Sequence, residues 1–120
     1  MEYSFRLDPP ITEAEALAQA EAMGFHALAF DQITEVDEPL HWHEFDSVSW
    51  VIEGSGAFAD EHGTVTEVQP GCRLEAPAGW LHRNLAGPPL RLVICTNIPG
   101  DRWTSPIDKD PADRPAHLAV

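Results

Sequence analysis

The sequence predicts an all-β protein, a jelly-roll barrel with one short N-terminal helix and a proline-rich C-terminal tail. Between residues 27 and 97, short apolar runs alternate with turns made of Gly, Pro and acidic residues. One alanine-rich segment precedes them, and a stretch rich in Pro and charge follows them. Several short strands fit a jelly roll, which limits exposed edges by wrapping two sheets together. A chain of 120 residues corresponds to a single domain.

The predicted helix lies in an N-terminal arm, residues 1–26. Thr12 and Glu15 form a capping-box pair, residues 14–23 are rich in Ala and Glu, and Gly24 suits the position after a helix end. The apolar side chains of this segment are small. We therefore expect the helix to pack lightly on the barrel or against a partner subunit.

The predicted barrel occupies residues 27–97. Its candidate strands are residues 27–34, 40–43, 47–53, 56–59, 64–68, 73–76, 80–83 and 90–97. Residues 98–120 form the tail, in which prolines alternate with charged residues and only Trp103 and Ile107 could anchor the chain to a core. The tail is expected either to be mobile or to lie across the barrel or a neighbouring subunit, with Trp103 as its anchor.

Three histidines are the candidate functional residues. His41 and His43 alternate along a predicted strand, so both rings face the same side. His82 follows a Pro/Gly turn onto another predicted strand. Neutral imidazole is the commonest metal ligand, and three histidines around an open position can hold a catalytic divalent ion. We interpret the other histidines as ordinary polar residues: His26, His62 and His117.

The spacing of these residues resembles the two motifs of the cupin family, Gly-x5-His-x-His-x(3–4)-Glu-x6-Gly and Gly-x5-Pro-x-Gly-x2-His-x3-Asn. The matching positions are His41, His43, Gly54, Gly71, Pro77, Gly79 and His82. The resemblance covers about residues 27–97 and implies a double-stranded β-helix with the histidines in its lumen. It also implies one divalent transition-metal ion (Fe, Ni, Zn or Mn). Dioxygenase is the leading activity, since three-histidine iron sites occur among cupin oxygenases acting on thiol acids or diketones.

The sequence departs from these motifs at three positions. Glu35 stands where the first motif opens with Gly, and Ala86 stands where the second ends with Asn, although Asn84 is nearby. Ser47 stands where the family has its metal-binding Glu. A regular strand places Ser47 on the face of the histidines, whereas a bulge would turn Asp46 toward that face instead. We therefore expect a three-histidine site with Asp46 as a candidate fourth ligand.

The same alternation predicts the lining of the pocket. Ser47, Ser49 and Val51 share the histidine face, and Trp80 is either an aromatic wall beside the metal or part of the core. Three neutral histidines leave a divalent ion with its full charge, which favours a small anionic, bidentate ligand. The sequence thus indicates a metal-dependent enzyme of dioxygenase type. The alternative is a protein that binds or senses a small molecule without turnover.

The composition excludes several classes of partner. The net charge of −13 and the lack of a basic cluster disfavour nucleic acid and anionic membranes. An anionic substrate would be attracted only at short range, by the metal or by Arg73, Arg83 or Arg91. No apolar run is long enough to span a membrane and no signal peptide precedes the arm, so a cytoplasmic location is expected. In that compartment we expect Cys72 and Cys95 to be free buried thiols.

A homodimer is the expected assembly. Large apolar residues alternate with the pocket residues and point to the other face of the same strands: Trp42, Val48, Trp50 and Ile52. One short alanine-rich helix is expected to leave part of this face exposed. Exposed apolar faces of this kind usually form interfaces, and two-fold dimers are the commonest assemblies.

Overall fold

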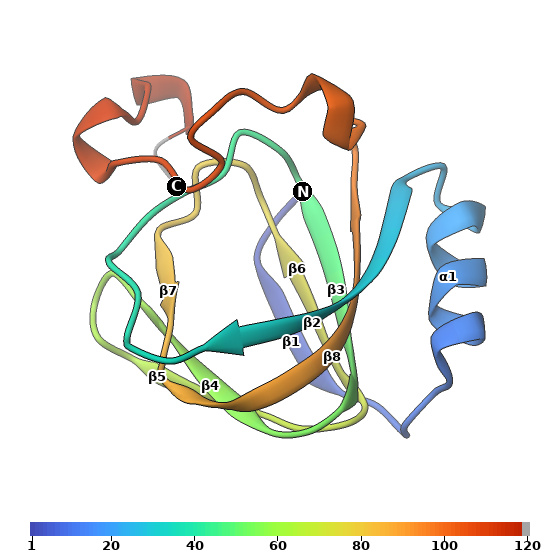
Figure 1. Cartoon of the computed structure of the whole chain (residues 1–120). Helices are drawn as coiled ribbons and strands as arrows, with labels where there is room; N and C mark the ends of the chain where they lie inside the picture. The colour runs from blue at the N-terminus through green and yellow to red at the C-terminus, as the bar shows by residue number, and fades with distance from the viewer. Residues whose placement is uncertain (119–120) are drawn as a thin grey trace.

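A computed structural model describes residues 1–118 and shows a barrel made of two antiparallel sheets (Figure 1). The predicted all-β class with one short helix is confirmed. The larger sheet has the strand order β1-β6-β3-β8-β2, and the smaller has the order β5-β4-β7. The strands are β1 (Ser4–Leu7), β2 (His26–Thr34), β3 (Ser47–Glu53), β4 (Gly56–Asp60), β5 (Val65–Val68), β6 (Cys72–Ala76), β7 (His82–Asn84) and β8 (Gly87–Thr96).

The structure differs from the sequence prediction in two segments. Strand β1 was not predicted, yet it pairs with β6 along its whole length and forms an edge of the larger sheet. The N-terminal arm therefore contributes to the barrel. Conversely, the segment expected as a strand at residues 40–43 makes only single bridges, from His41 to His82 and from Trp42 to Lys109. Residues 40–43 therefore pair with two neighbouring segments, each through a single residue, and do not form a strand.

Helix α1 (Glu13–Ala22) begins with the predicted capping box, in which Thr12 and Glu15 each accept a hydrogen bond from the other's backbone N–H. Its small side chains allow a close approach to the outer face of the larger sheet (Figure 1). Ala16 and Ala20 are fully buried in a cluster with Val48, Trp50, Val93 and Cys95. No helix among the described residues is long and apolar enough to cross a membrane.

The apolar face on which a dimer was expected is therefore covered within the chain. Val48 and Trp50 are buried under α1, and Trp42 is buried with its indole Nε1 donating to the backbone carbonyl of Asp110, 2.8 Å away. Ile11, Leu17 and Phe25 add to the covering layer. The expectation that part of this face stays exposed is wrong for Trp42, Val48 and Trp50, because α1 covers two of them and the C-terminal segment covers Trp42. Ile52 is only partly buried. The homodimer itself stays a prediction.

The C-terminal segment lies along one end of the barrel (Figure 1). It contains three short 3₁₀ turns, Gly100–Arg102, Pro111–Asp113 and Ala116–Leu118. Trp103 stacks on Phe45 with ring centroids 4.6 Å apart, as expected of an anchor, and its Nε1 donates to the carbonyl of Ile98. Lys109 pairs with Trp42 through two backbone hydrogen bonds. We call residues 98–110 the strap, because this segment crosses the barrel end beside the histidines.

Candidate metal centre

The three predicted histidines meet at one point. Each of His41, His43 and His82 offers one ring nitrogen that lies within 4.8 Å of the other two. The ring centroids are 4.5–5.0 Å apart, and each pair of ring planes is inclined by 59–62°. Three rings arranged around an axis in this way can direct their nitrogen lone pairs at one ion.

The backbone holds the three residues in place. His41 and His82 exchange both backbone hydrogen bonds, at 2.9 and 3.0 Å, so their side chains emerge together. The carbonyl of His43 accepts a hydrogen bond from the N–H of Gly79, in the turn before β7. Gly79 has a φ of 86°, which an L-residue rarely adopts, and this explains the glycine of the Pro-x-Gly turn.

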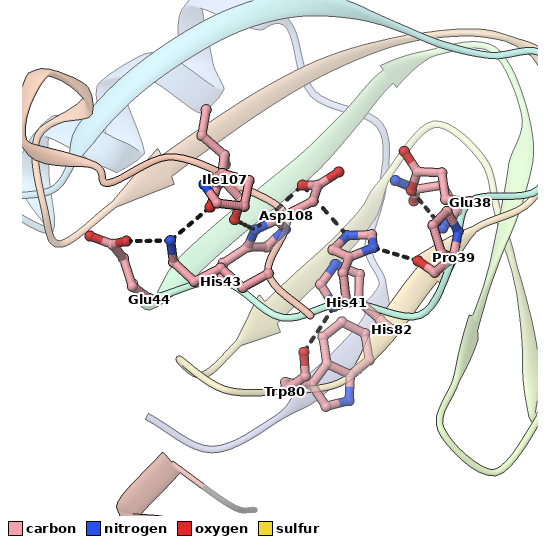
Figure 2. Close-up of polar contacts among 12 residues, drawn as sticks. Glu38, Pro39, His41, His43, Glu44, Trp80, His82, Ile107 and Asp108 are labelled. Atoms are coloured by element: carbon pink, nitrogen blue, oxygen red, sulfur yellow. Dashed lines mark hydrogen bonds and ion pairs between the residues drawn. The ribbon is translucent and has the colours of Figure 1, made fainter. Parts of the chain in front are cut away.

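Hydrogen bonds also orient the rings. The Nδ1 atoms of His41, His43 and His82 lie 2.8–3.0 Å from the backbone carbonyls of Pro39, Ile107 and Trp80 respectively (Figure 2). A carbonyl can only accept, so each Nδ1 carries the proton and each Nε2 keeps a free lone pair. Metal-binding histidines in proteins are held in this way, by a partner on the nitrogen that does not bind the ion. The three backbone carbonyls therefore fix the tautomer in which each Nε2 is free to bind a metal ion.

Aromatic stacking supports two of the imidazoles. The His82 ring lies parallel to that of Trp80, with centroids 4.5 Å apart, and the His43 ring is stacked on Phe45 at 5.1 Å. Burial among these rings lowers the pKa of His82 to about 3, with a further contribution from the neighbouring His43 and His41. Burial also lowers the pKa of His43. These two imidazoles are consequently neutral near pH 7, as metal ligands must be.

Asp46, the candidate fourth ligand, lies outside this cluster. Its Oδ1 accepts a hydrogen bond of 2.8 Å from the N–H of Ala78, and its own N–H donates to Asn97. These bonds tie the start of β3 to the Pro/Gly turn that precedes β7. Strand β3 keeps a regular register with β6 from Ser47 onward, so the bulge that would turn Asp46 to the histidine face is not formed there.

An inner cavity of about 130 Å³ lies between the sheets, with His43 and His82 at one end. Its wall is mostly aliphatic and aromatic, with the hydroxyls of Ser47 and Ser49 among the few polar groups. The predicted pocket residues Val51 and Trp80 also line it. The other lining residues are Phe5, Phe30, Gln32, Phe58, Val68, Cys72, Leu74, Ala76, Asn84, Leu90, Leu92 and Ile94.

A second, more open cavity of about 400 Å³ adjoins the first and forms its mouth. His43 lines both, and His41 lines the outer one. The strap supplies part of the outer wall through Trp103, Ile107 and Asp108, none of which the sequence analysis assigned to the site. The apolar anchors Trp103 and Ile107 were the only sequence signal that the tail could reach a core. No local pattern marked Asp108.

The cationic residues expected to attract a substrate are elsewhere. Among the described residues that line the two cavities there is no Lys or Arg. Arg91 pairs with Glu13 and Asp31 on the outer side of the barrel, and Arg73 pairs with Glu75. A negative charge on a ligand could therefore be neutralised only by a metal ion bound at the histidine cluster.

Comparison with known proteins identifies the fold. No family profile matches the sequence, and no curated protein matches it significantly. Solved structures do match. A DUF861 family protein of Thermotoga maritima has a TM-score of 0.52 and 17% identity over 78% of this chain and 97% of its own. A cupin-2 domain protein of Shewanella frigidimarina has a TM-score of 0.50 and 19% identity over 79% and 80%.

A third match is the DMSP lyase DddQ of Ruegeria pomeroyi, with a TM-score of 0.52 and 22% identity over 68% of this chain. This chain spans 41% of that larger protein. At such identities the likeness establishes the arrangement of strands and not the activity. Together with the two motifs and the two-sheet barrel, these matches show that the chain has the cupin fold.

Proposed function

We propose that this protein is a metal-dependent enzyme, of dioxygenase type, that acts on a small molecule able to chelate a divalent ion through oxygen or sulfur. The observation that carries the proposal is the convergence of three imidazoles whose Nδ1 atoms are all bonded to carbonyls. This arrangement leaves three Nε2 lone pairs for one ion. Three protein ligands with room for further ligands are typical of catalytic rather than structural sites.

The two cavities suggest how a substrate would lie. The inner cavity is apolar, small and continuous with the histidines, so it suits a compact aliphatic or aromatic group. The hydroxyls of Ser47 and Ser49 make no hydrogen bond within the described part of the chain and are available to a ligand. A chelating anionic group would remain at an ion bound by the cluster, because the described residues that line the cavities include no Lys or Arg.

The chain's own groups would bind and orient the substrate and exclude water. A bound transition-metal ion would supply Lewis-acid chemistry and, in the case of iron, oxygen chemistry. Trp80, stacked on His82, forms a wall of the inner cavity and prevents that ring from turning. Dioxygenase type rests on the resemblance of the motifs to three-histidine cupins, and the substrate class rests on the lining.

One observation favours a second candidate, binding without turnover. The inner cavity has no carboxylate and no Lys among its described lining residues, and its only titratable groups are His43, His82 and the Cys72 thiol. A reaction that needs a carboxylate or amine as a separate general base would lack one there. Oxygen chemistry at a metal makes less demand on such a group, which is why we place the enzyme first.

The test uses protein purified without a histidine tag. Metal analysis should find close to one divalent ion per chain, and oxygen uptake by iron-loaded protein should be screened against small thiol acids, diketones and aromatic hydroxy acids. His82→Ala should lose the ion, since two ligands hold it poorly. His62→Ala, at an exposed turn, is the matched control. Full metal loading of His82→Ala would refute the metal centre, and binding of a ligand without oxygen uptake would favour the second candidate.

A further inference from the structure

The strap brings one carboxylate to the candidate metal centre. Lys109 pairs with Trp42 in an antiparallel bridge, through backbone hydrogen bonds of 3.0 and 3.2 Å. In such a pair, residues opposite each other share a face. The register therefore sets Asp108 opposite His43, on the face that carries both histidines and not on the face of Trp42. A shift of one residue would point this side chain away.

Distances confirm the placement. Asp108 Oδ1 lies 3.8 Å from His41 Nε2 and 3.7 Å from His43 Nδ1 (Figure 2). An ion bound tetrahedrally through bonds of about 2.1 Å separates its ligand atoms by about 3.4 Å. The 3.8 Å distance from the carboxylate oxygen to His41 Nε2 is thus within a few tenths of an ångström of the separation expected between two ligands of one ion. His43 Nδ1 is the nitrogen bonded to the Ile107 carbonyl, so the distance to it shows proximity to the cluster and not to a ligand atom.

The other carboxylates at the mouth have partners. Three acidic residues line the outer cavity: Asp31, Glu38 and Asp108. Asp31 is paired with Arg91, and Glu38 accepts a hydrogen bond of 2.9 Å from the N–H of Asn84. Within the part of the chain that the structure describes, the Asp108 carboxylate has only the two histidines within ion-pair distance and accepts no hydrogen bond.

The strap segment is held firmly on both sides of this residue. The carbonyl of Ile107 accepts from His43 Nδ1, and Lys109 Nζ is 3.1 Å from the Glu44 carboxylate. The Glu44 carboxylate also accepts from Thr104, which together with Lys109 lowers its pKa. The contacts of Ile107 and Lys109 therefore hold Asp108 in place beside the three histidines.

From this geometry we propose that Asp108 is a fourth metal ligand, supplied by the strap in place of the carboxylate that is absent at position 47. This inference rests on the proposed function, since it requires a metal at the three histidines. One carboxylate lowers the net charge of a divalent centre from two to one. The ion is then held by groups from three parts of the chain, and an incoming anionic ligand competes with the strap for one position.

The experiment titrates the metal-free protein with Co²⁺ and follows its visible absorption. Asp108→Asn should weaken Co²⁺ binding at least about tenfold, the lower range for loss of a group that supports a metal site. Asp101→Asn removes the same charge from an exposed strap residue that makes no side-chain hydrogen bond among the described residues, and should leave binding unchanged. Azide should bind the Co²⁺-loaded Asp108→Asn protein more tightly than the wild type, because a position and a unit of positive charge are freed.

The outcomes separate the two proposals. Equal Co²⁺ affinity in Asp108→Asn and Asp101→Asn, with loss of binding in His82→Ala, would overturn the role of Asp108 alone. Failure of the wild type to bind Co²⁺, or full binding by His82→Ala, would overturn the metal centre itself. Asp108→Asn should unfold like the wild type when metal-free, since the carboxylate makes no hydrogen bond there. Weaker Co²⁺ binding together with this unchanged unfolding would establish the inference.

Discussion

Lowering the pH should destabilise the metal-free protein through His82. Burial lowers the pKa of this imidazole from 6.5 to about 3, so between these values the unfolded chain binds a proton that the folded chain does not. Stability is therefore greatest above pH 6.5 and falls as the pH drops toward 3. Proton linkage with these two values lowers the free energy of unfolding by about 2 kcal/mol between pH 7 and pH 5.

Urea denaturation with a chelator present, at pH 7 and pH 5, measures this change. The comparison is with His82→Asn, which removes the titrating group but keeps a polar side chain at the same position. The wild type should lose about 2 kcal/mol more than the variant between the two pH values. Equal losses in the two proteins would show that His82 is not held neutral by burial, and would refute the reasoning.

Three further predictions concern the strap, the Pro/Gly turn before β7 and the assembly. Trp103→Ala should lower the stability of the strap's contact with the barrel by about 0.5–1.5 kcal/mol, the strength of an aromatic stack such as that on Phe45. Hydrogen exchange at the Lys109 amide should then become faster, whereas in Trp103→Phe it should stay close to the wild-type rate. In urea denaturation, Gly79→Ala should lower the free energy of unfolding by roughly 1–3 kcal/mol more than Gly63→Ala does. Both glycines have a positive φ, but only at Gly79 would an added Cβ clash, because it would lie 2.2 Å from the carbonyl oxygen of Leu118. Equal losses of stability would contradict this packing. Light scattering at micromolar concentration tests the homodimer, and a monomer would contradict it.

Local patterns predicted much of the barrel and the histidine cluster. The alternation of residues 47–53 fixed both faces of β3, because side chains on a strand point to opposite sides in turn. The Thr12–Glu15 pair marked the start of α1, because a capping box involves only neighbours in sequence. Motif spacing pointed to His41, His43 and His82, although their convergence is a property of the folded barrel.

Contacts between distant segments could not be read from such patterns. Strand β1 is short, and its pairing with β6 joins residues far apart in the sequence. The small side chains of α1 suggested a light contact, yet Ala16 and Ala20 let it pack closely over Val48 and Trp50. Both features depend on how surfaces fit together, which periodicity does not record.

The sequence by itself determined the all-β class, the capped helix and the three histidines, because each depends on spacing within a short stretch of chain. Tertiary structure alone decided that the strap crosses the mouth of the barrel and which of its carboxylates reaches the site. The reason is the single bridge between Trp42 and Lys109: its register turns Asp108 toward the histidines, and a register between segments so far apart is set only when the chain has folded.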